Sequence, residues 1–164
     1  MRLRLLAVLL FLSSLAMAAP PTGDRAALLK LHAQDRDGHL KGDAEQLTAP
    51  LAPMFTEVVG GHATVMSRDD AKQHFAEYLK SVKFTHWDDA ADPVIRISPD
   101  GKMAYMIVQT KAEVAAIDHP ETKRAFLNSA IQTFEKGPTG WQMTAIAATV
   151  GNIPGAPKAP SAGK

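Results

Sequence analysis

Residues Asp24–Lys41, with the sequence DRAALLKLHAQDRDGHLK, decide how the rest of the chain is arranged. This stretch has the period of an amphipathic helix, and its spacing places four residues on one face: Leu28, His32, Asp35 and His39. A face that mixes leucine, histidine and carboxylate suits the wall of a partly polar cavity better than a dry core. The sequence therefore predicts a helix over residues 24–41 that turns this face toward a cavity. Thr22 or Asp24 can cap its start, and Gly42 can end it in the left-handed conformation.

Three interpretations of the polar residues on this face are open. In the first, Asp35 hydrogen-bonds one ring nitrogen of His39, four residues on, and so frees the other nitrogen as a general base, with His32 nearby. In the second, two imidazoles and a carboxylate hold a metal ion. His32 and His39, however, lie about 10 Å apart along a helix axis, so one ion does not easily reach both, and no metal is predicted. In the third, the residues form only local ion pairs on a helix flank.

The first eighteen residues have the pattern of a signal peptide. Arg2 and Arg4 make a basic start, residues 5–15 form a short apolar run, and residues 16–18 fit the small-x-small cleavage rule. The run is too short for a membrane helix, which needs about 20 apolar residues, so a retained anchor is the less favoured alternative. We expect cleavage after Ala18, export to the periplasm or beyond the cell, and no stable membrane anchoring.

Composition narrows the chemistry of the exported chain. It contains no cysteine, which excludes disulfides, thiolate ligands and a cysteine nucleophile. The charges are 18 basic against 17 acidic side chains, and loss of Arg2 and Arg4 leaves 16 against 17. Such a balance predicts binding neither to nucleic acid nor to an anionic membrane surface. Residues 24–150 suit one domain, and the Pro- and Gly-rich residues 151–164 are predicted to be a disordered tail.

The rest of the chain divides into short elements, with helices before strands. Ser67 to Asp70 resembles a capping box that opens a helix over residues 68–82, and residues 43–47 suit one helical turn. Gly60-Gly61 joins two strands in a hairpin. The predicted strands are residues 54–59, 62–66, 84–87, 94–98, 102–115, 124–136 and 141–150, and Pro99-Asp100-Gly101 is predicted to be a turn. Helices segregated from a run of strands predict an α+β fold.

Two strands offer residues for an apolar ligand site. Trp87 is either the floor of a pocket or an ordinary core aromatic at a strand end. In residues 102–115, Tyr105 and Gln109 share one face of the strand, and Ala104, Met106, Val108 and Thr110 share the other. The period of two does not decide which face is turned inward. Tyr105 and Gln109 are taken as candidate ligand contacts.

The last two strands add further candidates. Asn128 and Gln132 lie between Phe126 and Phe134 on one face of residues 124–136. If this face is buried, their amides need partners, which a ligand can supply; the alternative is a polar outer face of the sheet. Met143 alternates with small alanines in the final strand, which leaves room for a cavity or for close helix packing.

Several segments resemble one protein superfamily in their order and spacing. They are Lys41–Ala44, Gly60-Gly61, Ser67–Ala71, Trp87–Asp89, Pro93–Gly101, Ala104, and Glu135-Lys136 followed by Gly140-Trp141. Together they resemble the nuclear-transport-factor-2-like superfamily, and specifically its ketosteroid-isomerase-like or SnoaL-like bacterial domains of unknown function. The resemblance covers residues 24–150.

This resemblance implies a cone-shaped, cystatin-like α+β fold: a curved antiparallel sheet wrapped around the helices, a cavity at the wide end, and commonly a homodimer formed through the outer face of the sheet. The aspartate base and oxyanion hole of ketosteroid isomerase are not reproduced, because neither long strand carries a central aspartate. Since the superfamily hosts many activities, the fold does not decide the function.

Three functions remain. We expect binding of a small, largely apolar molecule, without a cofactor. The alternatives are a cofactor-free isomerase, lyase or hydrolase that uses Asp35 with His32 or His39, and a structural or dimerising module.

Overall fold

The computed structural model describes residues 23–151. The helices are α1 (Asp24–Lys41), α2 (Ala44–Thr48) and α3 (Arg68–Leu79). The strands are β1 (Leu51–Val59), β2 (His62–Ser67), β3 (Val82–Ile97), β4 (Met103–Ala116), β5 (Lys123–Gly137) and β6 (Gly140–Gly151). The predicted signal peptide and all of the predicted tail beyond Gly151 lie outside these residues. No helix in the described range is long and apolar enough to cross a membrane.

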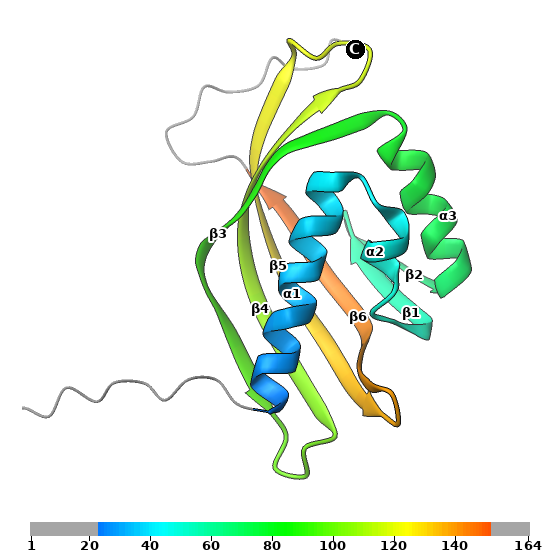
Figure 1. The fold of residues 1–164 in the computed structure, drawn as a ribbon, viewed down its shortest axis with the longest axis vertical. Coiled ribbons are helices and arrows are strands. Elements are labelled where there is room, and N and C mark those ends of the chain that lie inside the picture. The colour runs from blue at the N-terminus through cyan, green and yellow to red at the C-terminus, as the bar shows by residue number, and fades with distance from the viewer. Residues whose placement is uncertain (1–22, 152–164) are drawn as a thin grey trace, which may run out of the picture.

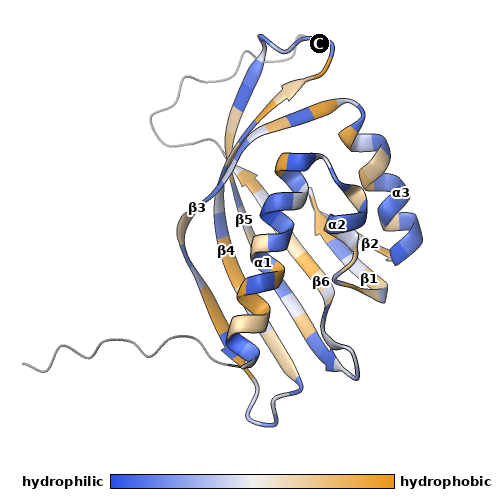
Figure 2. Ribbon diagram, viewed as in Figure 1, coloured by the Kyte–Doolittle hydropathy of each residue, from blue (hydrophilic) through white to orange (hydrophobic). Residues whose placement is uncertain are grey.

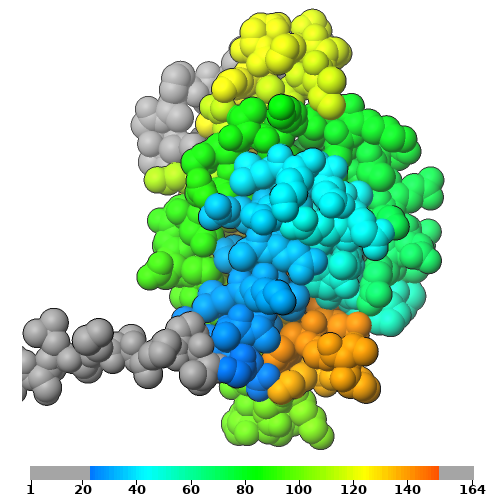
Figure 3. Space-filling view, in the orientation of Figure 1, coloured from blue at the N-terminus to red at the C-terminus, as the bar shows by residue number. Residues whose placement is uncertain are grey.

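The strands form one sheet in the order β2-β1-β6-β5-β4-β3, and the helices lie against one of its faces (Figure 1). Every neighbouring pair is antiparallel except β1 and β6, which run parallel. The sheet is therefore mixed, whereas the sequence analysis expected an antiparallel one. The α+β class and the curved sheet packed around the N-terminal helices are confirmed. In the space-filling view, α1 and α2 cover the middle of the sheet (Figure 3).

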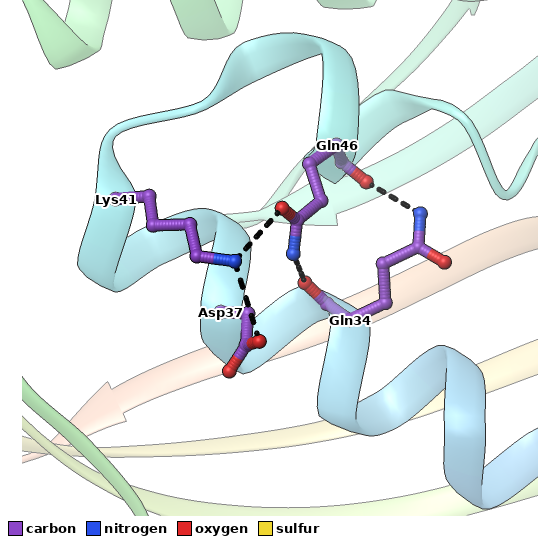
Figure 4. A network of polar contacts seen from close by, with 4 residues as sticks. All are labelled: Gln34, Asp37, Lys41 and Gln46. Carbon is purple, nitrogen blue, oxygen red and sulfur yellow. Dashed lines mark hydrogen bonds and ion pairs between the residues drawn. The ribbon is translucent and has the colours of Figure 1, made fainter.

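The bounds predicted for α1 are confirmed, and a polar network joins α1 to α2. Gly42 ends α1 in the left-handed conformation (φ 68°), as expected for a glycine cap. The side chains of Gln34 and Gln46 each donate a hydrogen bond to the other residue's backbone carbonyl, at 3.0 and 2.9 Å (Figure 4). This pairing holds α2 against α1 and places Leu47 over Gly38, which is buried.

The start of α1 differs from the prediction that Thr22 or Asp24 caps it. The cap residue is Gly23, with no side-chain cap, and Asp24 is already helical; Thr22 lies outside the described range. The Asp24 carboxylate instead accepts hydrogen bonds from Lys136 Nζ at 2.6 Å and Trp141 Nε1 at 3.0 Å. These two donors, the lysine above all, hold the pKa of Asp24 below its ordinary value. The carboxylate thus joins the start of α1 to the β5–β6 end of the sheet.

Helix α3 begins as predicted but ends three residues early. The Ser67 hydroxyl accepts a hydrogen bond from the Asp70 backbone N–H at 3.1 Å, which confirms the cap. The helix ends at Leu79, where the Ser81 hydroxyl donates to the carbonyl of Tyr78. Val82 was expected in the last turn of the helix, but it belongs to β3 and pairs with Ala116. Its β-branched side chain favours a strand.

The two short strands predicted around Asp92-Pro93 are one long strand, β3. Its pairing with β4 shifts register between Asp89 and Ala91 and again between Ala91 and Val94. These irregularities carry the strand past Pro93. A proline is tolerated there because β3 is the edge strand of the sheet, where one side of the backbone needs no partner.

The core consists of two clusters of buried side chains between the sheet and the helices. The larger contains Leu28, Leu51, Phe55, Ala71, Ile95, Ala104, Met106, Val108, Ala130, Phe134, Trp141 and Met143. The smaller contains Leu47, Leu79, Phe84, Trp87, Ala112, Val114 and Phe126. Along α1, hydrophobic and hydrophilic residues are interspersed (Figure 2), so the helix does not seal the region between the clusters with a purely apolar stripe.

Candidate functional site

A cavity of about 160 Å³ lies where the two core clusters meet. Some of its lining residues belong to the two core clusters, and others are polar. The lining residues are Asp35, His39, Leu47, Leu51, Phe55, Glu57, Phe75, Trp87, Val108, Thr110, Asn128, Gln132, Met143 and Ile146. The cavity is therefore lined by α1, α2, α3 and the inner face of five strands. Six of the nine residues proposed from sequence as site residues are in this set.

The inner face of the sheet is set by the pairing of β4 with β5. Cross-strand partners point to the same side, so Val108 lies beside Ala130, and Met106 beside Gln132. Val108 and Thr110 are buried and line the cavity. Tyr105 and Gln109 have the opposite parity and are exposed on the outer face, so they do not reach the cavity.

Helix α1 contributes His39 and Asp35. The ring of His39 stacks on Trp87 with 3.7 Å between centroids and planes 6° apart. Its Nδ1 lies 2.9 Å from the backbone carbonyl of Asp35 and 3.5 Å from the carboxylate. A carbonyl only accepts, so Nδ1 carries the proton and Nε2 is left as the basic nitrogen of the neutral ring. The sequence analysis assigned this orienting role to the carboxylate, but the backbone of the helix performs it.

His32 does not join the other two candidates. Its Nε2 lies 2.8 Å from the Asp89 carboxylate on β3, and His32 does not line the cavity. Its Nδ1 is buried without a partner in the described chain. His32 and His39 are seven positions apart on α1, and they contact different residues of β3, Asp89 and Trp87 respectively. The predicted trio is therefore divided into a helix–strand ion pair and a cavity-lining pair.

Strand β5 places its two amides on the cavity wall. Asn128 pairs with Thr110 of β4, and Gln132 is 4% exposed. The Oε1 atom of Gln132 is buried and has no hydrogen-bond partner within residues 23–151, and the same holds for Nε1 of Trp87. A buried polar group without a partner costs roughly 1–3 kcal/mol. Both groups belong to residues that line the same cavity.

Two lining residues with useful chemistry were missed by the sequence analysis. Glu57 lies on β1 two positions after buried Phe55 and lines the cavity with it. The alternation of residues 55 and 57 was the available signal, because a strand turns such residues to the same face. Thr110 was visible too, as part of the strand face opposite Tyr105.

The lining offers proton-transfer and hydrogen-bonding groups. It holds two carboxylates, one imidazole, two amides and a hydroxyl, but neither lysine nor arginine. Within the described range, no three His, Asp or Glu side chains are grouped closely enough to hold a metal ion. The arrangement can bind a small molecule and orient its polar groups.

The outer face of the sheet presents an apolar row that crosses five strands. Successive cross-strand partners in this row are Val94, Ile107, Ile131, Ala147 and Val58. All four of its larger members are exposed. Part of the row borders a shallow groove of about 560 Å³, whose lining contains only uncharged residues.

Comparison with known proteins gives structural but not sequence matches. No family model matches the chain, and no curated protein matches it. A conserved protein from Planctomyces limnophilus is 17% identical, with a TM-score of 0.67 over 79% of this chain and 98% of that one. An NTF2-like protein from Cytophaga hutchinsonii is 13% identical, with a TM-score of 0.62 over 78% and 98%.

A third solved structure is described both as NTF2-like and as having a cystatin-like fold. It is an NTF2-like protein with a cystatin-like fold from Novosphingobium aromaticivorans, 16% identical, with a TM-score of 0.58 over 76% of this chain and 80% of that one. At these identities the likeness concerns the fold alone. The mixed curved sheet, the helices on its inner face and these structural matches show that the chain has the nuclear-transport-factor-2-like, cystatin-like fold.

Proposed function

We propose that the protein binds a small, largely apolar molecule in the cavity between α1 and the inner face of the sheet. The observation that carries this proposal is the pair of buried, unpartnered polar atoms, Gln132 Oε1 and Trp87 Nε1, on residues that line one cavity together with several apolar side chains. Ligand sites in proteins typically combine an apolar wall with a few placed polar groups.

The volume sets the size of the ligand. A cavity of about 160 Å³ is close to the engineered apolar cavity of about 150 Å³ that binds benzene. It is well below the roughly 300–1,000 Å³ of sites for drug-sized molecules. The ligand, or the part of it that enters, is therefore about the size of one aromatic ring with a short substituent.

A titration followed by amide NMR tests this proposal, with benzyl alcohol as the probe. The largest shift changes are expected at residues lining the cavity, such as Val108, Gln132 and Met143. Val108→Phe fills the cavity from its wall and is expected to abolish the response. Ile107→Phe makes the same kind of change at the next residue, on the outer face, and is expected to preserve it.

Two outcomes would overturn the proposal. One is the absence of saturable shifts at cavity residues with benzyl alcohol and with the smaller toluene. The other is an equal response in Val108→Phe and Ile107→Phe. If Val108→Phe does not fold, Ile146→Phe closes the same cavity from β6.

We also propose that two copies of the chain associate through the outer face of the sheet. The exposed row Val94, Ile107, Ile131, Ala147 and Val58 supports this, because a monomer rarely exposes so continuous an apolar surface. A second copy is the fitting occupant: an uncharged patch is complementary to itself in a two-fold contact.

Light scattering after size-exclusion chromatography tests the association. The purified protein should elute with twice the mass of one chain. Ile107→Glu places a charge in the row and should give monomers with an unchanged circular dichroism spectrum. Lys30→Glu, on the exposed side of α1, is the matched control and should remain dimeric. Monomers in the unmodified protein would refute the dimer and leave the ligand proposal intact.

Export is the third proposal, and it rests on residues 1–18 alone. The basic start, the short apolar run and the small residues before Ala19 support cleavage after Ala18. Expression of the full-length chain in a bacterium with an outer membrane should place the protein in the periplasm, and N-terminal sequencing should begin at Ala19. An intact Met1 on protein from the periplasm would contradict the cleavage site.

A further inference from the structure

We infer that the cavity selects molecules whose apolar body carries a protonated amine. This inference rests on the proposed ligand binding and deepens it by fixing the sign of the ligand's charge. Three features of the lining lead to it: the carboxylates, the unpartnered amide oxygen and the aromatic rings.

The first feature is uncompensated negative charge. Asp35 and Glu57 line the cavity from opposite layers, one on α1 and one on β1. No lysine or arginine is among the lining residues. Within the described chain, the one ionisable partner of Asp35 is His39, whose Nδ1 lies 3.5 Å from the carboxylate, and Glu57 has no ion-pair partner. A carboxylate that loses water to an apolar ligand without gaining a cation is destabilised, so an anionic or neutral ligand is disfavoured relative to a cation.

The second feature is a demand for hydrogen-bond donors. Gln132 is 4% exposed, lines the cavity, and its Oε1 has no partner in residues 23–151. Carboxylate and amide oxygens are acceptors, and an ammonium group supplies three donors and no acceptor. One lining atom needs a hydrogen-bond acceptor instead, because Trp87 Nε1 is a donor without a partner. Hydrogen bonds to a carboxylate are stronger than those made by a neutral N–H, so the two carboxylates set the sign of the preferred ligand.

The third feature is the aromatic content of the wall. Phe55, Phe75 and Trp87 line the same cavity as the carboxylates. Aromatic faces attract cations and also bury an apolar ring, so they suit both ends of an amine with an aromatic or alkyl body. The stack of His39 on Trp87 occupies one face of the indole and fixes its plane.

Three probes of nearly equal size test the inference at neutral pH and low salt: benzylamine, benzyl alcohol and benzoate, titrated by amide NMR or calorimetry. Benzylamine is expected to bind about tenfold more tightly than benzyl alcohol, and benzoate more weakly than both. Asp35→Asn and Glu57→Gln should each reduce the preference for benzylamine, and the double variant should remove it. Glu135→Gln, an exposed carboxylate on β5 outside the lining, is the matched control and should keep it.

The outcomes separate the two proposals. Saturable binding of benzyl alcohol with no preference for benzylamine would overturn the charge inference and leave ligand binding standing. A preference for benzoate would do the same. Absence of binding by all three probes would overturn both. Because the comparison of the three probes needs only the unmodified protein, it remains decisive even if a carboxylate variant fails to fold.

Discussion

The two faces of the sheet differ in how their polar and apolar residues are distributed. The inner face is apolar at both ends but holds Thr110, Asn128 and Gln132 around a cavity in the middle. The outer face carries an exposed apolar row through Ile107 and Ile131 where solvent would favour polar side chains. Each face thus departs from the simple rule of apolar inside and polar outside. The first departure supports the proposed ligand site, and the second supports the proposed contact between two copies of the chain.

The largest expected effect tests the packed end of the inner face. Phe134 is 1% exposed and belongs to the larger core cluster. Phe134→Ala should lower the free energy of unfolding by about 3–5 kcal/mol, because the ring leaves a cavity that its neighbours fill only in part. Met103→Ala, at an exposed outer-face position, should cost less than about 1 kcal/mol. Urea denaturation measures both, and equal losses would show that the faces are not distinct.

A second prediction concerns how tightly the helices pack above the inner face. Gly38→Ala would place a methyl group 2.7 Å from Leu47 Cδ2 and 3.3 Å from the Leu47 backbone nitrogen. Alanine gains about 1 kcal/mol over glycine in a helix, but overpacking costs about 1–3 kcal/mol, so a net loss is expected. Combining it with Leu47→Ala should cost less than the sum of the two single changes. A stabilised Gly38→Ala variant would show that Leu47 moves aside freely.

The third prediction makes the same substitution on each face. Gln132→Leu removes a buried acceptor that has no partner, so the free energy of unfolding should rise by about 1 kcal/mol while benzylamine binding weakens. Gln109→Leu, exposed on the outer face, should change stability by less than about 0.5 kcal/mol and leave binding unchanged. Destabilisation by Gln132→Leu would mean that the amide is already satisfied, and the contrast between the faces would weaken.

The smallest effect is at the junction of α1 with β5 and β6. Hydrogen bonds from Lys136 and Trp141 hold the pKa of Asp24 below its ordinary value of 3.8. A carboxyl whose pKa is lowered by folding stabilises the protein above its unfolded value, and this contribution is lost as the pH falls through the folded value. Melting temperatures of Asp24→Asn should therefore match the unmodified protein most closely in acid and fall below it near neutral pH. A constant difference across this range would exclude the linkage.

Much of the fold was predictable because local signals agreed with it. The glycine cap of α1, the capping box of α3 and the turn at Gly101 are determined by a few residues each, and the structure contains all three. The continuity of β3 was not predictable in this way. Pro93 is a strand breaker in a central strand, and only the position of β3 at the edge of the sheet makes it tolerable.

The site was predictable in composition but not in arrangement. Asn128 and Gln132 stood out as amides between phenylalanines, and both line the cavity. Tyr105 and Gln109 were proposed as ligand contacts, but they lie on the outer face of the sheet. The sequence did not show this, because the outer face of β4 also carries apolar residues and so resembles the inner face. His32 was grouped with His39 by helical period, but its partner Asp89 lies on β3, 57 positions away, which no local pattern indicates.

The parallel contact of β1 with β6 has a consequence for assembly of the molecule. The strand that closes the described chain lies between the β1–β2 hairpin and the β3–β5 meander, and the sheet contains no other link between these two blocks. An isolated two-stranded hairpin is at best marginally stable in water. The β1–β2 hairpin therefore gains its neighbour in the sheet only after residues 140–151 have been synthesised, and the hydrophobic interior cannot close before then.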